Sequence, residues 1–416
     1  GRLAQTVENP GVAADAINVT KYNMVRIPVI IIALYLSIVS AFSQTTVDTT
    51  SYVNRKLKID EVNFVGSYYQ QDGNNAAVTG GVGSEKLTDI PTTVDIRMSR
   101  IDKKSRLHTY SVELGMDSYT SASSDNIDPS TISSASSSDE RYYPTFHWEV
   151  SNEKTGNAVG ATLSGSFEYD YYSIGVGMKG SKKSKDNNRQ ISLRLQTFQD
   201  RLSLIYPIEL RNGSPTGSAS RDTYTASITI SQVVNTRFQM MLLLDPSYQH
   251  GYLSLPFNRV YFNDNTVAIE SLPASRFKIP IGIRANYFIG DRLIVRALYR
   301  YYWDDWNLKG HTIDLETTVK ITPFISLTPF YRYYTQSAVR YFASYAAQSK
   351  GAEFYTSDYD LSKFESHFAG LGFRIVSPDG IFGLTRWNMV EIRYGHYERQ
   401  TGLASNIVSI YSRFIK

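Results

Sequence analysis

The stretch that decides the fold runs Phe277-Lys278-Ile279-Pro280-Ile281-Gly282-Ile283-Arg284-Ala285-Asn286-Tyr287. Its odd positions are apolar or aromatic, and its even positions are polar, small or proline. Because successive side chains of a strand point to opposite faces, one face of this strand is apolar and the other polar. Gly290-Asp291 follows as a predicted two-residue hairpin turn, and the alternation resumes from Leu293 to Trp303.

The same alternation recurs along the chain, for example over 94–99 and 313–321. Short links fall at 102–105, 153–156, 184–188, 235–236, 290–291 and 322–323, and longer ones near 71–86, 120–140, 200–220, 251–275 and 336–362. Strands counted between these links number about sixteen, within a range of about fourteen to eighteen. An even number of strands puts both ends of the barrel chain on one side, and because short and long links alternate, the long loops lie on the opposite side, as in outer-membrane barrels.

A sheet with an apolar outer surface cannot leave its edge amides unpaired in hydrocarbon, so it has to close on itself. The sequence therefore predicts an all-β protein, a closed antiparallel transmembrane β-barrel with short periplasmic turns and long extracellular loops. A soluble β-sandwich or propeller would explain the alternation. It would not explain the asymmetry of the loops or the aromatic residues at the strand ends, Tyr299, Tyr301, Trp303, Tyr331 and Tyr333, which resemble an interfacial girdle.

The region before the first strand predicts export. Met24-Val25-Arg26 precedes an apolar run from Ile27 to Val39, and Ala41 and Ser43 fit the small residues of a cleavage site. We expect an upstream or artefactual extension over 1–23, a signal peptide over 24–43, a short periplasmic segment over 44–58 and the barrel over 59–416. The expected location is the outer membrane of a Gram-negative cell, with its lipid as the surrounding partner.

Composition narrows the function classes. The chain has 31 Tyr, 19 Phe and no Cys, which excludes disulfides and thiolate metal sites. Its formal charge of +4 is scattered rather than gathered in a basic block, so no nucleic-acid partner is expected. Nothing in the sequence specifies an oligomeric state.

Several segments resemble a family of exported proteins known as domain of unknown function thirty-five-seventy, common in the Bacteroidota. The segments are Tyr68–Asn75, Tyr119–Ser130, Leu255–Phe262, Tyr302–Trp306 and Tyr355–Ser362. The resemblance covers essentially the whole chain after the signal peptide. It implies an outer-membrane barrel and hints at a redox-linked role in the cell envelope, and it brings no functional residues with it.

The polar face carries charges of both signs. The predicted lumen-facing charged residues are Asp95, Arg97, Glu113, Asp117, Glu149, Arg194, Arg284, Arg296, Arg300, Asp314, Glu316, Arg332, Glu391 and Arg393. In one interpretation, acids on the third strand face arginines on the eleventh across the lumen and set a transverse field that filters polar solutes. In the other, Arg296 and Arg300 pair locally with Asp314 and Glu316 and simply line the wall.

The sequence also contains a candidate metal-binding loop and candidate catalytic histidines. The Ser- and Asp-rich loop 121–140 offers oxygen ligands that suit Ca²⁺, although without EF-hand spacing, and it could instead fold into the lumen as a constriction. No other cofactor is expected. The six histidines, among them His147 and His396, belong to no recognisable catalytic motif.

The leading functional prediction is a channel or transporter for small polar solutes, not an enzyme. The first alternative is a non-conducting scaffold that docks another envelope protein, in which the aromatic segment 341–345 would form a plug or an external contact. A hydrolase at the outer rim is the third.

Overall fold

The computed structural model describes residues 56–120, 138–211 and 216–415. The predicted extension, the signal peptide and most of the 44–58 segment lie outside the described residues, as does most of the loop 121–140. Among the described residues, no helix is long and apolar enough to cross a bilayer.

The described part of the chain forms one closed antiparallel sheet of eighteen strand segments, in which two strands are each interrupted once, so that the barrel has sixteen strands. The predicted number is confirmed. In order, the strands are β1 (Lys58–Asp72), β2 (Leu87–Asp89) continued by β3 (Thr92–Ile101), β4 (Leu107–Thr120), β5 (Ser138–Asn152), β6 (Asn157–Phe167), β7 (Tyr171–Lys183), β8 (Arg189–Ile205), β9 (Thr216–Asn235), β10 (Phe238–Leu244) continued by β11 (Ser247–Gly251), β14 (Ser275–Ile289), β15 (Leu293–Asp304), β16 (Lys309–Lys320), β17 (Ile325–Gln336), β18 (Phe364–Val376), β19 (Trp387–Arg399) and β20 (Ala404–Ile415).

Both interruptions contain a proline, Pro91 between β2 and β3 and Pro246 between β10 and β11. Proline has no N–H to donate to the ladder, so a strand is locally broken where it sits. The proline carbonyls still accept bonds from the neighbouring strands, at 2.9 Å from the Ser67 amide and 3.0 Å from the Ala226 amide. Pairing therefore continues past each break.

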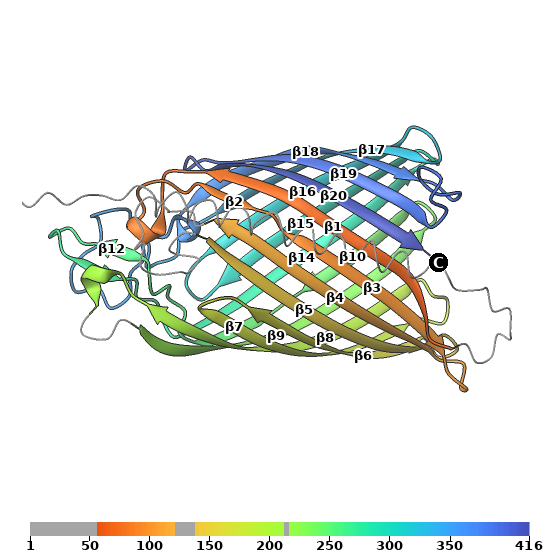
Figure 1. Ribbon diagram of the computed structural model, residues 1–416, viewed down its shortest axis with the longest axis horizontal. Coiled ribbons are helices and arrows are strands. Elements are labelled where there is room, and N and C mark those ends of the chain that lie inside the picture. The colour runs from red at the N-terminus through yellow and green to blue at the C-terminus, as the bar shows by residue number, and fades with distance from the viewer. Residues whose placement is uncertain (1–55, 121–137, 212–215, 416) are drawn as a thin grey trace, which may run out of the picture. The chain divides into compact units, whose positions relative to one another are not determined.

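Closure comes from the first and last strands. β1 pairs with β20 from Glu61 opposite Ile415 to Asp72 opposite Ala404. The shorter turns gather at the end of the barrel where β20 ends, and the longer loops gather at the opposite end, beside the label β12 (Figure 1). This is the arrangement that the alternation of loop lengths predicts.

Three details differ from the sequence prediction. Ile289 pairs with Leu293, so the turn at Gly290 has three residues rather than two. The loop predicted near 200–220 is shorter, because β8 continues to Ile205 and β9 begins at Thr216. The loop between β11 and β14 contains a small hairpin of its own, β12 (Arg259–Tyr261) and β13 (Val267–Ile269).

Three short 3₁₀ turns lie among the long loops, η1 (Ala77–Thr79), η3 (Ile208–Leu210) and η4 (Tyr359–Leu361). They belong to an assembly built mainly from residues 252–274 and 337–363, which we call the loop assembly. Its two segments are joined by backbone bonds such as Ser271 with Tyr355 and Asn263 with Gln348.

Candidate functional site: the inner wall of the barrel

The two faces of the sheet differ in chemistry. On β14 the exposed apolar side chains are Phe277, Ile281, Ile283, Tyr287 and Ile289, which is the outer set of the quoted alternation. Since residues paired directly across an antiparallel ladder share a face, the outer and inner sets can be followed from strand to strand around the barrel.

The register places all the predicted lumen-facing charged residues on the inner face. Arg284 lies opposite Leu298, which lies opposite Asp314, which lies opposite Arg332. Asn286, Arg296, Glu316 and Phe330 form the next row. Asp95 and Glu113 pair on β3 and β4, and the remaining members occupy the same face of their strands: Arg97, Asp117, Glu149, Arg194, Arg300, Glu391 and Arg393.

Local ion pairs neutralise part of this wall. The Arg296 guanidinium lies 2.5 Å from a Glu316 carboxylate oxygen, and Arg393, three strands away, reaches the other oxygen at 2.8 Å. Arg332 holds Asp314 at 2.7 Å. Further inward pairs include Lys179 with Glu149, Arg374 with Glu391 and Arg97 with Glu61. The predicted partnership of Arg300 with Asp314 or Glu316 is wrong, because arginines from β15, β17 and β19 occupy both carboxylates.

Other charges stay without an ion pair within the described part of the chain. Within the predicted lumen-facing set, these are the cations Arg194, Arg284 and Arg300 and the acids Asp95, Glu113 and Asp117. Asp95 accepts a hydrogen bond from Ser111, and Asp117 accepts one from Tyr143. The unpaired acids lie on β3 and β4, while Arg284 and Arg300 lie on β14 and β15, about half the circumference away. The acids and arginines that have no local ion pair therefore lie on opposite walls, as the transverse-field hypothesis requires.

Two cavities open along the arginine-bearing wall. The first has a volume of about 520 Å³ and is lined by Arg284, Arg296, Leu298, Phe330, Phe368 and Arg393, among others. The second, of about 530 Å³, contains Arg300, Tyr334, Tyr397 and Arg399. Leu298, Arg332, Phe368 and Ile407 line both, so the two cavities adjoin.

At the long-loop end, the loop assembly packs on inward-facing residues of β14 and β15. Trp306, Leu308 and Val339 form a buried cluster against which Tyr302, Tyr341 and Phe342 pack. Tyr341 meets the Trp306 ring edge-on, with centroids 5.9 Å apart. The aromatic segment 341–345 thus contributes at least Tyr341 and Phe342 to an internal contact, although Tyr345 stays exposed.

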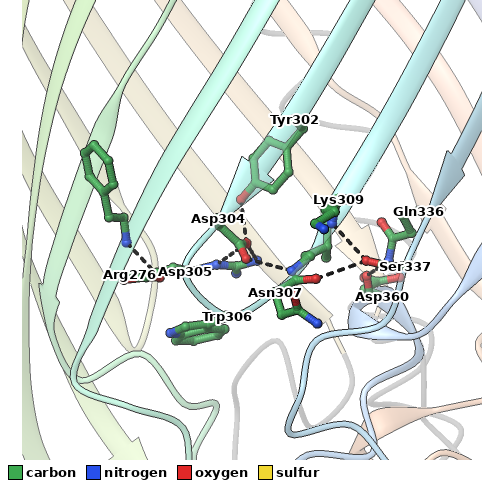
Figure 2. A network of polar contacts seen from close by, with 12 residues as sticks. Arg276, Tyr302, Asp304, Asp305, Trp306, Asn307, Lys309, Gln336, Ser337 and Asp360 are labelled. Atoms are coloured by element: carbon green, nitrogen blue, oxygen red, sulfur yellow. Dashed lines mark hydrogen bonds and ion pairs between the residues drawn. The ribbon is translucent and has the colours of Figure 1, made fainter.

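A buried ion pair supports this contact (Figure 2). Asp304 has no exposed surface and accepts bonds from Arg276 Nε at 2.9 Å, Arg276 Nη2 at 2.5 Å, Tyr302 OH at 2.9 Å and the Leu308 amide at 2.9 Å. The Arg276 guanidinium also lies 4.3 Å from the centre of the Trp306 ring. The sequence did not predict this pair, because its pattern placed Asp304 at the start of a loop rather than in a strand.

The loop assembly also buries acids. Glu270 accepts bonds from the Thr356 hydroxyl at 2.6 Å and the Leu255 amide at 2.7 Å, and burial raises the pKa of its carboxyl. Burial, followed by the nearby charges of Asp360 and Glu270, raises the pKa of Asp358 to about 7. No feature of the sequence around these acids distinguishes them from ordinary loop residues.

A third acidic group lies beside the Ser-rich loop. Asp139, Glu168 and Asp170 each offer a carboxylate oxygen, and these oxygens lie within 4.8 Å of one another. Burial and the two neighbouring carboxylates raise the pKa of Asp170 to about 6. The other residues of the hypothesised calcium site lie outside the described residues, except Glu140, so calcium binding stays a prediction.

The predicted girdle residues Tyr299, Tyr301, Trp303, Tyr331 and Tyr333 lie on the outer face toward the long-loop ends of β15 and β17. Outward histidines bond to two of them, His311 to Tyr299 at 2.9 Å and His367 to Tyr331 at 2.7 Å.

The histidines named as candidate bases lie apart from one another. His147 is inward and bonds to the Thr162 hydroxyl at 2.8 Å, while His396 is outward and bonds to Asn406 and Glu398. Within the described residues, none of the six histidines has a hydrogen bond to a serine hydroxyl. The rim hydrolase remains the third hypothesis, with no geometry in its favour.

A family model described as a protein of unknown function, DUF3570, matches residues 32–400. The chain belongs to the DUF3570 family. The family resemblance noted in the sequence is thereby confirmed. No curated protein matches this DUF3570 member.

Several solved structures are similar to this DUF3570 chain. OccK2 (OpdF) of Pseudomonas aeruginosa aligns with 8% identity and a TM-score of 0.40, over 85% of this chain and 97% of that one. OccD3 (OpdP) of the same organism aligns with 9% identity and a TM-score of 0.43, over 86% and 91%. A structure titled bacterial polysaccharide outer membrane secretin has 11% identity and a TM-score of 0.43, over 86% and 98%.

Proposed function

We propose that this DUF3570 protein is an outer-membrane channel for small polar solutes. Its short turns would face the periplasm and its long loops the exterior. An apolar outer face and a closed hydrogen-bonded sheet are what hydrocarbon demands of a spanning β-structure. Membrane lipid is the partner that this surface fits.

One observation carries the channel proposal. Charged side chains on the inner face of the closed sheet remain open to water, with Arg332 50% and Arg97 52% exposed as side chains. An interior packed shut by side chains would bury such groups. The hydrated inner wall therefore supports passage of polar solutes.

Charge selection is the finer part of the proposal. Asp95, Glu113 and Asp117 on one wall and Arg284 and Arg300 on the other would orient a solute that carries charge and favour some ions over others. The local pairs add rigidity to the wall, and most of their charge is neutralised.

The test is reconstitution of the purified protein into a planar bilayer, with conductance and size cut-off measured together. We expect discrete channel steps, and a reversal potential in a salt gradient that shifts toward cations in Arg284→Gln/Arg300→Gln and toward anions in Asp95→Asn/Glu113→Gln. Absence of conductance from folded protein would refute the channel. Opposed pairs of variants that leave the reversal potential unchanged would refute charge selection alone.

The non-conducting scaffold is the second candidate, and the loop assembly favours it. Segments 252–274 and 337–363 are bonded to each other and packed on inward residues at one mouth, which is a design suited to closing a barrel or presenting a rigid docking surface. A redox-linked envelope partner remains the prediction that the family resemblance suggests. Folded protein that never conducts, together with a stable envelope complex after cross-linking, would favour this candidate.

A further inference from the structure

Two phenylalanine rings lie on the inner wall beside the arginines. Phe330 on β17 and Phe368 on β18 have ring centroids 5.2 Å apart, and both line the first cavity. The guanidinium carbon of Arg393 lies 4.8 Å from the centre of the Phe330 ring. An apolar, aromatic surface is therefore present inside an otherwise charged wall.

Glycines on the neighbouring strands make room for these rings. A Cβ atom at Gly370 would lie 2.4 Å from the Phe330 ring, and one at Gly395 would lie 2.5 Å from the Phe368 ring. Any larger residue at either position would push a ring off the wall. With Leu298, which lines both cavities, Phe330 and Phe368 form what we call the apolar patch.

The charge around the patch is net positive. The first cavity holds four arginines, at 284, 296, 332 and 393, against the two carboxylates of Asp314 and Glu316. Those carboxylates are already engaged by Arg296, Arg332 and Arg393. Arg284 is left without an ion pair in the described part of the chain.

A second unengaged arginine lies next to the first. Arg300 pairs across the ladder with Gly282, two residues from Arg284 on β14, so the two arginines are diagonal neighbours on the inner face. Leu298 lies directly opposite Arg284. Both residues are exposed, and neither side chain has a hydrogen bond or ion pair within the described residues, so their donors are available for an incoming anion.

We propose that Arg284, Arg300 and the apolar patch form a binding subsite for small carboxylates that carry an aromatic ring. The carboxylate accepts hydrogen bonds from Arg284 and Arg300, which match its geometry through paired N–H groups. The ring packs on Leu298, Phe330 and Phe368, where aromatic contact adds to the burial of apolar surface. This inference rests on the proposed channel and names a class of solute for it.

The test is equilibrium binding to the full-length protein in detergent, measured by calorimetry with four probes: benzoate, cyclohexanecarboxylate, acetate and benzyl alcohol. We expect benzoate to bind most tightly. Acetate lacks the ring, and benzyl alcohol lacks the charge, so each should bind at least about tenfold more weakly. Equal affinity for benzoate and acetate would overturn the role of the apolar patch, and no measurable benzoate binding would overturn the subsite.

Variants locate the subsite. Arg284→Gln/Arg300→Gln should weaken benzoate binding by about tenfold or more, because each arginine supplies a charge-assisted bond. Phe330→Leu should weaken benzoate more than acetate. The matched control is Arg194→Gln, which removes another inward arginine without an ion pair, from β8, outside both cavities. An equal loss in the control would show that only the total charge of the lumen matters, and it would overturn the site.

Two readouts keep the proposals separate. The heat-dependent shift in gel mobility that folded barrels show reports whether each variant is folded, and conductance is recorded on the same preparations. Conductance without selective benzoate binding would refute the subsite but not the channel. Selective binding without conductance would refute the channel but not the ligand site in the barrel wall.

Discussion

The buried Arg276–Asp304 pair allows a sharp test of how the loop assembly is held. Asp304→Asn keeps the size of the side chain but removes the charge that four donors now share. Arg276 would then remain only 13% exposed without its counter-charge. Removing one partner of a buried pair costs about 3–5 kcal/mol. An asparagine oxygen can still accept from the Leu308 amide, so we expect a cost near 3 kcal/mol, at the lower end of that range.

That cost should appear as local opening, since the strand ladders around the pair do not depend on it. A loss of about 3 kcal/mol corresponds to roughly a hundredfold increase in the opened fraction. Hydrogen exchange followed by mass spectrometry should show peptides covering 304–309 and 337–342 exchanging about that much faster, with β17 and β18 unchanged.

The control is Lys350→Gln, which breaks the exposed pair of Lys350 with Asp264 in the same loop assembly, where the two side chains are 65% and 34% exposed. Exposed pairs contribute about 0–1 kcal/mol, so exchange should change little. Acceleration of less than about threefold in Asp304→Asn, or an equal effect in the control, would refute the reasoning.

Three more predictions concern pH, the outer face and the inner wall. Burial raises the pKa of Asp358 from 3.8 to about 7 and raises that of Glu270, so both acids stabilise the closed loop assembly when they are protonated. Hydrogen-exchange protection of 355–361, corrected for intrinsic exchange, should therefore be greatest below about pH 4 and fall up to about pH 7. This pH dependence should be weaker in Asp358→Asn, and protection that rises with pH would contradict the prediction. Ile283→Arg puts a charge on the lipid-facing side of β14 and should lower the free energy of unfolding, measured in urea, by about 2–4 kcal/mol. Ser227→Arg, on the inner face, should lower it much less, and equal losses would argue against the assigned faces. Gly115→Ala places a Cβ 1.8 Å from the Tyr143 ring and should cost about 1–3 kcal/mol, while Gly180→Ala, with nothing within 4 Å, should be nearly neutral in the same measurement.

Alternation made the faces of the barrel predictable. Over 277–287 the apolar positions are the outward ones, and the same period placed the charged residues on the inner face without any knowledge of their neighbours. A two-residue period is a local property of the strand, so it does not depend on the rest of the chain.

Partners across several strands were not predictable in this way. Arg393 reaches Glu316 over two intervening strands, and Gly372, directly opposite Arg393 on β18, leaves room for its side chain. Adjacent-strand pairing was the only partnership that the sequence could suggest, which is why Arg300 was paired wrongly. The contact of Trp306 with Tyr341 likewise depends on a loop returning to the barrel, which no local pattern records.

The pairing of β1 with β20 bears on how the barrel is assembled. The seam joins residues more than three hundred positions apart, as in the bonds of Tyr411 with Asn63 and of Ser67 with Ser409. Contacts so distant in sequence form slowly, since the entropy of closing the intervening chain has to be met first. The barrel therefore closes only when β20 is present, and until then the backbone N–H and C=O groups on the free edge of β1 are unpaired. An unpaired strand edge can pair with other chains, so the unclosed protein has to be protected from aggregation before it reaches the membrane.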